Sequence, residues 1–171
     1  AFAWYHPVKV IGHFAEAIAD DMREGVTVYA VGRLDVASWT RPDGTKAERV
    51  EIIANTLKTL DVPDTAIDRD QADQPRLLDG VNRVLVMGNL TSDASLHHTT
   101  AQRPVTKFRI AVNERRGRDE EHTSFLSARC WDDLATAAVH LTKGAPVVAS
   151  GRLVTESWTT HDGRQRSATK I

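Results

Sequence analysis

The chain has 171 residues, of which 41% are hydrophobic and 26% charged, the composition of an ordinary globular protein. No apolar run approaches the roughly 20 residues that span a bilayer, and no secretory leader opens the chain. We therefore expect a cytoplasmic protein without a membrane partner. The single cysteine, Cys130, excludes an internal disulfide and a multi-cysteine zinc site.

The formal net charge of −1 conceals an uneven distribution. Residues 1–60 carry 7 Lys and Arg against 8 Asp and Glu, residues 61–80 carry 2 against 6, and residues 81–171 carry 13 against 9. The last segment therefore has the strongest electrostatic case for a polyanionic partner.

The first predicted elements are a strand from Trp4, an alanine-rich helical segment that ends at Gly25, and a strand that carries Trp39 into a turn at Asp43-Gly44. The following stretch, LDVPDTAIDRDQADQPRLLDG, contains two prolines and six aspartates and no sustained apolar period. This composition is typical of a linker, and we place an acidic linker at residues 61–80.

The sequence of the second half of the chain predicts five strands and one helix. VNRVLVMGNL is rich in strand-forming residues, VTKFRIAVNE alternates with the period of a half-buried strand, and FLSARCW supplies a third strand. DDLATAAVHLTKG predicts a short helix, which begins with aspartates and ends at Gly144. APVVASGRL and a hairpin around Asp162-Gly163 complete the set. This element order indicates a five-stranded Greek-key barrel with a helix between strands three and four.

The two halves are copies of each other. Residues 25–52 and 144–171 are identical at 12 of 28 positions, and GRLDVASWTRPDG from Gly32 matches GRLVTESWTTHDG from Gly151. Shifting the alignment by one residue extends the match upstream, where the segment from Trp4 aligns with the segment from Ser124. The expected fold class is therefore all-β with one short helix per domain. The first barrel (residues 1–60) lacks its opening two strands, and the last strand of the second (residues 81–171) is cut short.

No group of side chains predicts catalysis. His97 and His98 fall in a predicted loop, where adjacent residues point apart, and Asp132-Asp133 falls where a helix cap is expected. There is no phosphate-binding glycine loop and no nucleophile elbow. We expect no enzymatic activity, no catalytic residue, no metal and no cofactor.

The repeated hairpin instead predicts a binding surface. Alternation puts Arg33 on the same side as Trp39, which is the less apolar side of that strand. In the second copy the pattern is weaker, but Arg152 again lies on the same side as Trp158. One such tryptophan is more often a core residue, but its repetition beside the same hairpin favours an exposed ring. Exposed rings beside cations can stack on nucleic-acid bases, and the cations contact phosphates.

The motifs NRVLVMGNLTSDASL, FRIAVNERR, WYHPVKVIGHFAEAIADDMREG and VYAVGRLDVASWTRPDG, in this arrangement, resemble the bacterial single-stranded DNA-binding proteins. Two copies in one chain are similar to the Deinococcus–Thermus form of that family. The resemblance covers everything except the linker. It implies tandem OB-folds that bind single-stranded DNA in replication, recombination and repair, in association with the nucleoid.

The resemblance also implies site residues, although the two copies differ. The family's strand-three Trp matches Trp4, with Ser124 and the adjacent Phe125 in the second copy. Its aromatic before the helix matches Trp131, where the first copy has Ile11. The family often has an aromatic residue after strand two, and this chain has Arg115-Arg116 there. The two arginines are equally compatible with DNA contact and with a solvated loop. The full predicted DNA-binding set is Trp4, Arg33, Trp39, Arg109, Arg115, Arg116, Phe125, Arg129, Trp131, Arg152 and Trp158.

Two further expectations concern partners. We expect a homodimer with four OB-folds, formed through the strand NRVLVMGNL opposite the DNA path, with a monomer as the alternative. The family implies an acidic C-terminal tail that recruits replication and repair proteins, and this sequence lacks one. The alternative function is a protein-interaction module built on a degenerate OB-fold pair.

Overall fold

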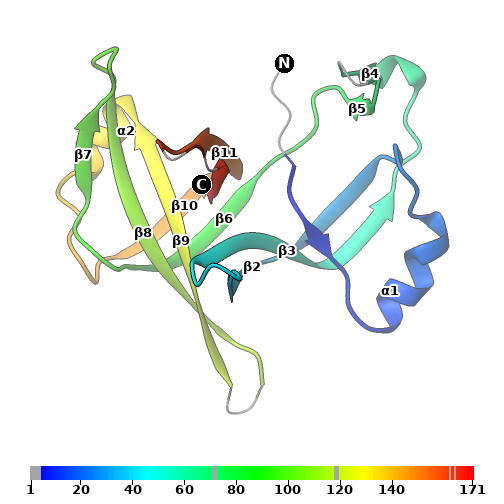
Figure 1. Ribbon diagram of the computed structural model, residues 1–171, viewed down its shortest axis with the longest axis horizontal. Coiled ribbons are helices and arrows are strands. Elements are labelled where there is room, and N and C mark those ends of the chain that lie inside the picture. Colours follow the sequence, from blue (N-terminus) through cyan, green and yellow to red (C-terminus); the bar gives the residue numbers. More distant parts are fainter. Residues whose placement is uncertain (1–4, 71–72, 118–119, 162, 164) are drawn as a thin grey trace. The chain divides into compact units, whose positions relative to one another are not determined.

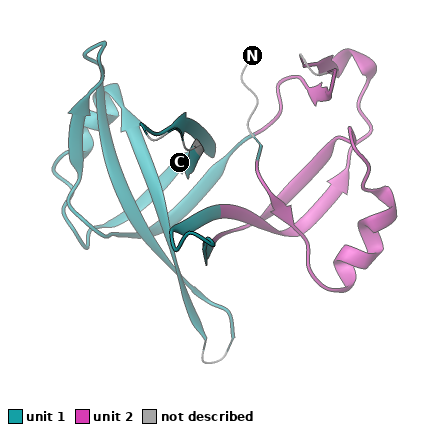
Figure 2. Ribbon diagram, in the orientation of Figure 1, with its two compact units in different colours: residues 1–5, 38–49, 82–171 teal, residues 6–37, 50–81 magenta. Residues whose placement is uncertain are grey.

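The computed structural model describes residues 5–70, 73–117, 120–161, 163 and 165–171 (Figure 1). The chain divides into two compact units (Figure 2). Unit 1 includes Ser38–Arg49 and Asn82–Ile171, and unit 2 consists of His6–Ala37 and Val50–Val81.

The first copy forms a three-stranded sheet in the order β1-β3-β2. Its elements are β1 (Val8–Lys9), α1 (His13–Ile18), the 3-10 helix η1 (Ala19–Asp21), β2 (Val28–Thr40) and β3 (Lys46–Thr59). Strand β1 runs parallel to β3, with Val8 opposite Ile52. Within the described residues of unit 2, only Glu51 and Ala54 are buried. The described residues of unit 2 therefore form only a sparse core.

The segment predicted as a linker contains a 3-10 helix, η2 (Asp64–Ala66), and two short antiparallel strands, β4 (Ile67–Arg69) and β5 (Pro75–Leu77). An ion pair between Arg76 and Asp68 links the strands. Pro75 packs closely on Gly25, where an added Cβ would lie 2.8 Å from the proline Cγ. The acidic segment is therefore part of unit 2 and packs on the first copy at Gly25.

The second copy forms the larger sheet, in the order β10-β6-β8-β9-β12-β11, and β7 also pairs with β8. Its strands are β6 (Val84–Leu90), β7 (Ser95–His98), β8 (Pro104–Arg115), β9 (Glu121–Trp131), β10 (Pro146–Gly151), β11 (Val154–Thr159) and β12 (Gln165–Lys170). Helix α2 (Asp132–Ala138) follows β9 directly. Because β10 and β11 are successive pieces of one predicted strand, this order is that of the predicted Greek-key barrel.

Three local features differ from the prediction. His97 and His98 lie on β7 and not in a loop, because four residues are too few to show an alternating pattern and the strand exists by pairing with β8. Helix α2 ends at Ala138 and is followed by a turn, with a hydrogen bond from the Leu141 N–H to the Ala138 carbonyl. No side chain caps α2, since its N-cap residue is Trp131.

The core of unit 1 lies on the inner face of the sheet. Ile110 on β8 and Leu126 on β9 are almost fully buried, as is Ala135 on α2. Thr106, also fully buried, donates its hydroxyl hydrogen bond to the Ala135 carbonyl at 2.8 Å. This bond satisfies a buried polar group and fixes the helix to the sheet.

Strands β10 and β11 are separated at Arg152 and Leu153, where the equivalent strand β2 is continuous. The side chain of Asn82 replaces a strand partner at this break. Its amide donates to the Leu153 carbonyl at 2.8 Å, and its side-chain oxygen accepts from the Leu153 N–H at 3.0 Å. Because Leu153 is buried, both backbone groups need these partners.

Replacement of Asn82 by Ala removes both bonds from a buried backbone. We expect Asn82→Ala to lower the free energy of unfolding by about 1–3 kcal/mol, measured by denaturant titration. Asn89→Ala is the matched control, since exposed Asn89 makes one such bond, to the Gly144 carbonyl. Equal losses in the two variants would contradict the role assigned to Asn82.

Candidate nucleic-acid interface

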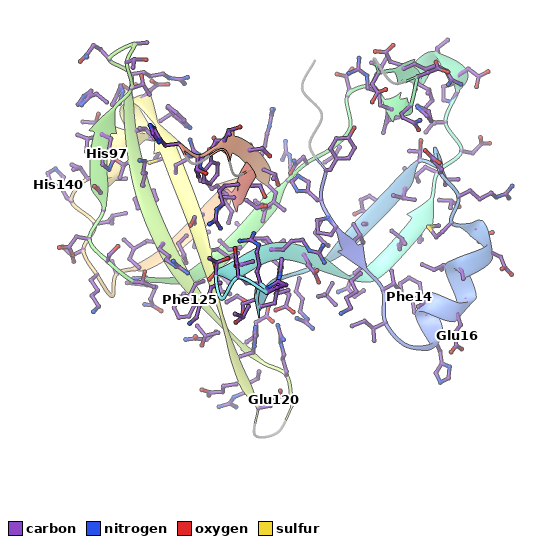
Figure 3. All side chains as sticks on the ribbon, in the orientation of Figure 1. Phe14, Glu16, His97, Glu120, Phe125 and His140 are labelled. Atoms are coloured by element: carbon purple, nitrogen blue, oxygen red, sulfur yellow. The ribbon has the colours of Figure 1, made fainter. Side chains whose placement is uncertain are left out.

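The β8–β9 pair presents one apolar and one charged face. In its antiparallel register Lys107 lies opposite Arg129, Arg109 opposite Ser127, and Ala111 opposite Phe125. These residues share the outer face, because side chains alternate along a strand. Figure 3 labels Phe125 between His97 on β7 and Glu120 in the β8–β9 loop.

Each aromatic ring on this face lies beside a guanidinium group. The Arg109 Cζ lies 5.5 Å from the centre of the Phe125 ring, and Phe125 is 45% exposed. The Trp131 ring has two such neighbours, Arg103 at 4.9 Å and Arg129 at 5.8 Å. These distances are within the range of cation–π attraction, so cations and flat apolar surfaces coincide here.

The hairpin tryptophans are exposed, as their position predicts. Trp39 at the end of β2 and Trp158 in β11 each retain 46% of their accessible surface. Arg49 lies 6.0 Å from the centre of the Trp39 ring, and Arg166 is opposite Trp158 in the β11–β12 register. Both rings can therefore accept a stacked base without unfolding of the hairpin.

The two hairpins also share their turn geometry. Gly44 and Gly163 have φ values of 78° and 77°, a region that glycine adopts readily. The N–H of each glycine bonds to a carbonyl three residues earlier, that of Arg41 or Thr160. The turns predicted at these positions are thus confirmed.

Glu156 restrains one of the predicted DNA-binding cations. Its carboxylate pairs with Arg129 and, at 2.8 Å, with Lys170. Burial opposes the ionisation of Glu156, but the hydrogen bonds from Lys170 and Arg129 outweigh burial, so its pKa lies below the usual value. A phosphate group that binds Arg129 must compete with this carboxylate.

The remaining predicted cations are placed differently. Arg33, Arg115 and Arg152 are exposed, whereas Arg116 is half-buried with its guanidinium 3.6 Å from Glu114. Arg109 lies 3.8 Å from Glu48 of the β2–β3 hairpin. Trp4 falls outside the described residues. Two further cations on this surface were not predicted. Strand alternation could have identified Lys107, but the partners of Arg103 are distant in sequence.

This arrangement combines stacking surfaces with cations that can bind phosphate. Among the described residues, no three His, Cys, Asp or Glu side chains converge on a common metal position. In the described part of the chain, no helix has both the length and the apolar character needed to cross a membrane. The geometry supports binding of an aromatic and anionic polymer.

The fold and surface together define a chain with two related copies, a three-stranded sheet and a larger sheet of Greek-key order, and with exposed aromatic rings beside cations. A model described as "Single-strand binding protein family" matches residues 2–60 and 81–171. The chain belongs to this family.

Relatives match nearly the whole chain. The single-stranded DNA-binding protein of Thermus thermophilus is 39% identical over 99% of this chain, and that of Deinococcus radiodurans is 36% identical over 98%. This chain spans 63% and 57% of those proteins. The crystal structure of wild-type single-stranded DNA binding protein from Thermus aquaticus superposes with a TM-score of 0.73 at 30% identity, over 98% of this chain and 66% of that one. The predicted tandem OB-fold class is confirmed.

The ion pairs of Glu156 predict a pH effect on stability. Because its folded-state pKa is lowered, its contribution is complete above the unfolded value of about 4.3 and is lost as the pH falls through the folded value. We expect Glu156→Gln to lose less unfolding free energy than the wild type on acidification from about pH 5, measured by denaturant titration.

The control is Glu24→Gln, since exposed Glu24 makes no ion pair in the described part of the chain. This variant should follow the wild-type pH dependence. A Glu156→Gln curve parallel to that of the wild type would show that the two cations do not favour the ionised carboxylate.

Proposed function

We propose that this protein binds and protects single-stranded DNA without sequence preference, in replication, recombination and repair. The observation that carries the proposal is the set of exposed rings Trp39, Phe125 and Trp158, two of them with an arginine within 6.0 Å. Stacking accepts any base, because every base has a flat aromatic face. Family membership and the names of the relatives support the same conclusion.

The protein acts in this proposal as a binding protein and not as an enzyme, in the cytoplasm and on the nucleoid. The outer-face cations Lys107, Arg109 and Arg129 contact phosphates while the rings contact bases. Recruitment of replication and repair proteins through an acidic tail stays a prediction from the family resemblance.

Intrinsic tryptophan fluorescence during titration with oligothymidine tests the proposal directly. We expect quenching on binding, and an affinity that falls with salt with a logarithmic slope of about −0.7 per phosphate neutralised. A protein-interaction module that uses the same rings would not quench with oligothymidine, and its complexes would depend little on salt.

Replacement of the hairpin tryptophans tests stacking. We expect Trp39→Ala and Trp158→Ala each to weaken oligothymidine binding by about 1–3 kcal/mol while the unfolding free energy changes little, because the rings are half-exposed. Trp158→Phe is the matched control and should retain most of the affinity. Unchanged affinity with a large loss of stability would show that the rings are core residues.

We further propose a homodimer with four OB-folds, assembled through the outer face of β6 and β10. Leu85, Met87 and Val148 are 66%, 68% and 65% exposed, and Met87 lies opposite Val148 in the strand register. Burial of such adjacent apolar side chains favours association. Two chains would join four binding units, which raises the effective concentration for a long strand.

We expect the complete protein to sediment as two chains at micromolar concentration and the Met87→Glu variant as one, since a charge would be buried in the contact. Leu134→Glu is the control, because Leu134 on α2 is similarly exposed but lies on another element. A wild-type mass of one chain would refute the dimer.

A further inference from the structure

The corner between the third strand and the helix differs between the two copies. In the first copy this corner is Ile11-Gly12, and in the second it is Trp131-Asp132. Both second residues have a positive φ, 73° for Gly12 and 58° for Asp132. Glycine adopts such angles without cost, whereas an L-residue with a side chain does not, although aspartate tolerates them better than most. The second copy therefore keeps an aspartate where glycine is the less strained residue.

The Asp132 carboxylate makes two hydrogen bonds to one arginine. Its oxygens accept from Arg103 Nε at 2.8 Å and from an Arg103 terminal nitrogen at 2.6 Å. This paired geometry fixes the plane of the guanidinium as well as its position. The hydrogen bond to Arg103 lowers the pKa of Asp132 and raises that of Arg103, so both groups stay charged near neutral pH.

The backbone of Arg103 is also held. Its N–H donates to the Thr99 hydroxyl at 3.1 Å, and its carbonyl accepts from the Thr99 N–H at 3.0 Å. Arg103 is thus fixed at its backbone by the β7–β8 turn and at its guanidinium by Asp132. Its Cζ lies 4.9 Å from the centre of the Trp131 ring, the shortest of the cation–ring distances in the described residues.

We propose that Arg103, held by Asp132, is a positioning residue that orients the Trp131 ring for base stacking in the second OB-fold. The inference rests on the proposed function, and it adds two residues to the binding surface. The first copy has no equivalent, because Ile11 and Gly12 supply neither the ring nor the carboxylate.

The effect of losing the Asp132 carboxylate on DNA affinity separates this proposal from a purely electrostatic role of the ion pair. The pair carries no net charge, so removal of the carboxylate should free Arg103 for phosphate and strengthen binding to a polyanion. If the pair orients Trp131, removal of the carboxylate should instead weaken binding. The two explanations are therefore distinguished by the sign of the change.

The experiment measures oligothymidine affinity and unfolding free energy for variants of the complete protein. We expect Asp132→Gly to bind about three- to tenfold more weakly, the scale of a lost cation–π contact and part of a stacking contact. Its stability should be unchanged or higher, because glycine relieves the positive φ. Asp133→Asn is the control, since it removes the same charge one residue later, where no ion pair exists among the described residues. It should bind as the wild type or slightly more tightly.

The Asp132→Gly substitution in a Trp131→Ala variant tests whether Asp132 and Arg103 act through the Trp131 ring. We expect Asp132→Gly to cause no loss of affinity when Trp131→Ala is already present, because the two changes are coupled. Arg103→Ala should reproduce the Asp132→Gly phenotype and keeps the inference testable if Asp132→Gly fails to fold. Tighter or unchanged binding by both single variants would overturn the inference. Failure of the wild type to bind oligothymidine would instead refute the proposed function.

Discussion

The antiparallel pairing of β8 and β9 is the constraint on which the fold and the binding surface both depend. The same register that turns Ile110 and Leu126 into the core places Arg109 and Phe125 on the outer face. Because side chains alternate with a period of two, a slip of one residue would bury the charges and expose the core. The position of every ring and cation on this face is therefore fixed by the stability of the fold.

Local ion pairs explain how a nearly neutral chain can carry a cationic surface. Glu156 pairs with Arg129 and Lys170, and Asp132 pairs with Arg103, so carboxylates already order these side chains before any ligand arrives. An ordered cation loses less conformational entropy when it binds phosphate, but the phosphate must displace or share the carboxylate. Net charge is therefore a poor guide to phosphate binding here. The affinity depends on how favourably a phosphate replaces the carboxylate beside each cation.

The sequence predicted the strands that have a long alternating pattern and the hairpin that occurs twice. It did not predict β7, whose four residues depend on pairing with β8, or the break at Leu153, which depends on Asn82 71 residues earlier. The cations were recognisable as arginines, but their carboxylate partners were not, because Arg103 and Asp132 lie 29 residues apart. Local patterns thus revealed the elements, whereas contacts made by folding determine which charges are free.

The two copies show which parts of a duplicated fold can diverge. The hairpin turn is a backbone property, and Gly44 and Gly163 keep it almost identical. The strand-to-helix corner requires a positive φ as well, but that requirement can be met by glycine or by an aspartate whose carboxylate gains a partner. Replacement of Gly by Asp at such a corner adds strain, and the two hydrogen bonds to Arg103 offset it. One backbone corner can therefore be aliphatic in the first copy and aromatic and ion-paired in the second, so the two copies differ in surface chemistry although the backbone geometry at the corner is kept.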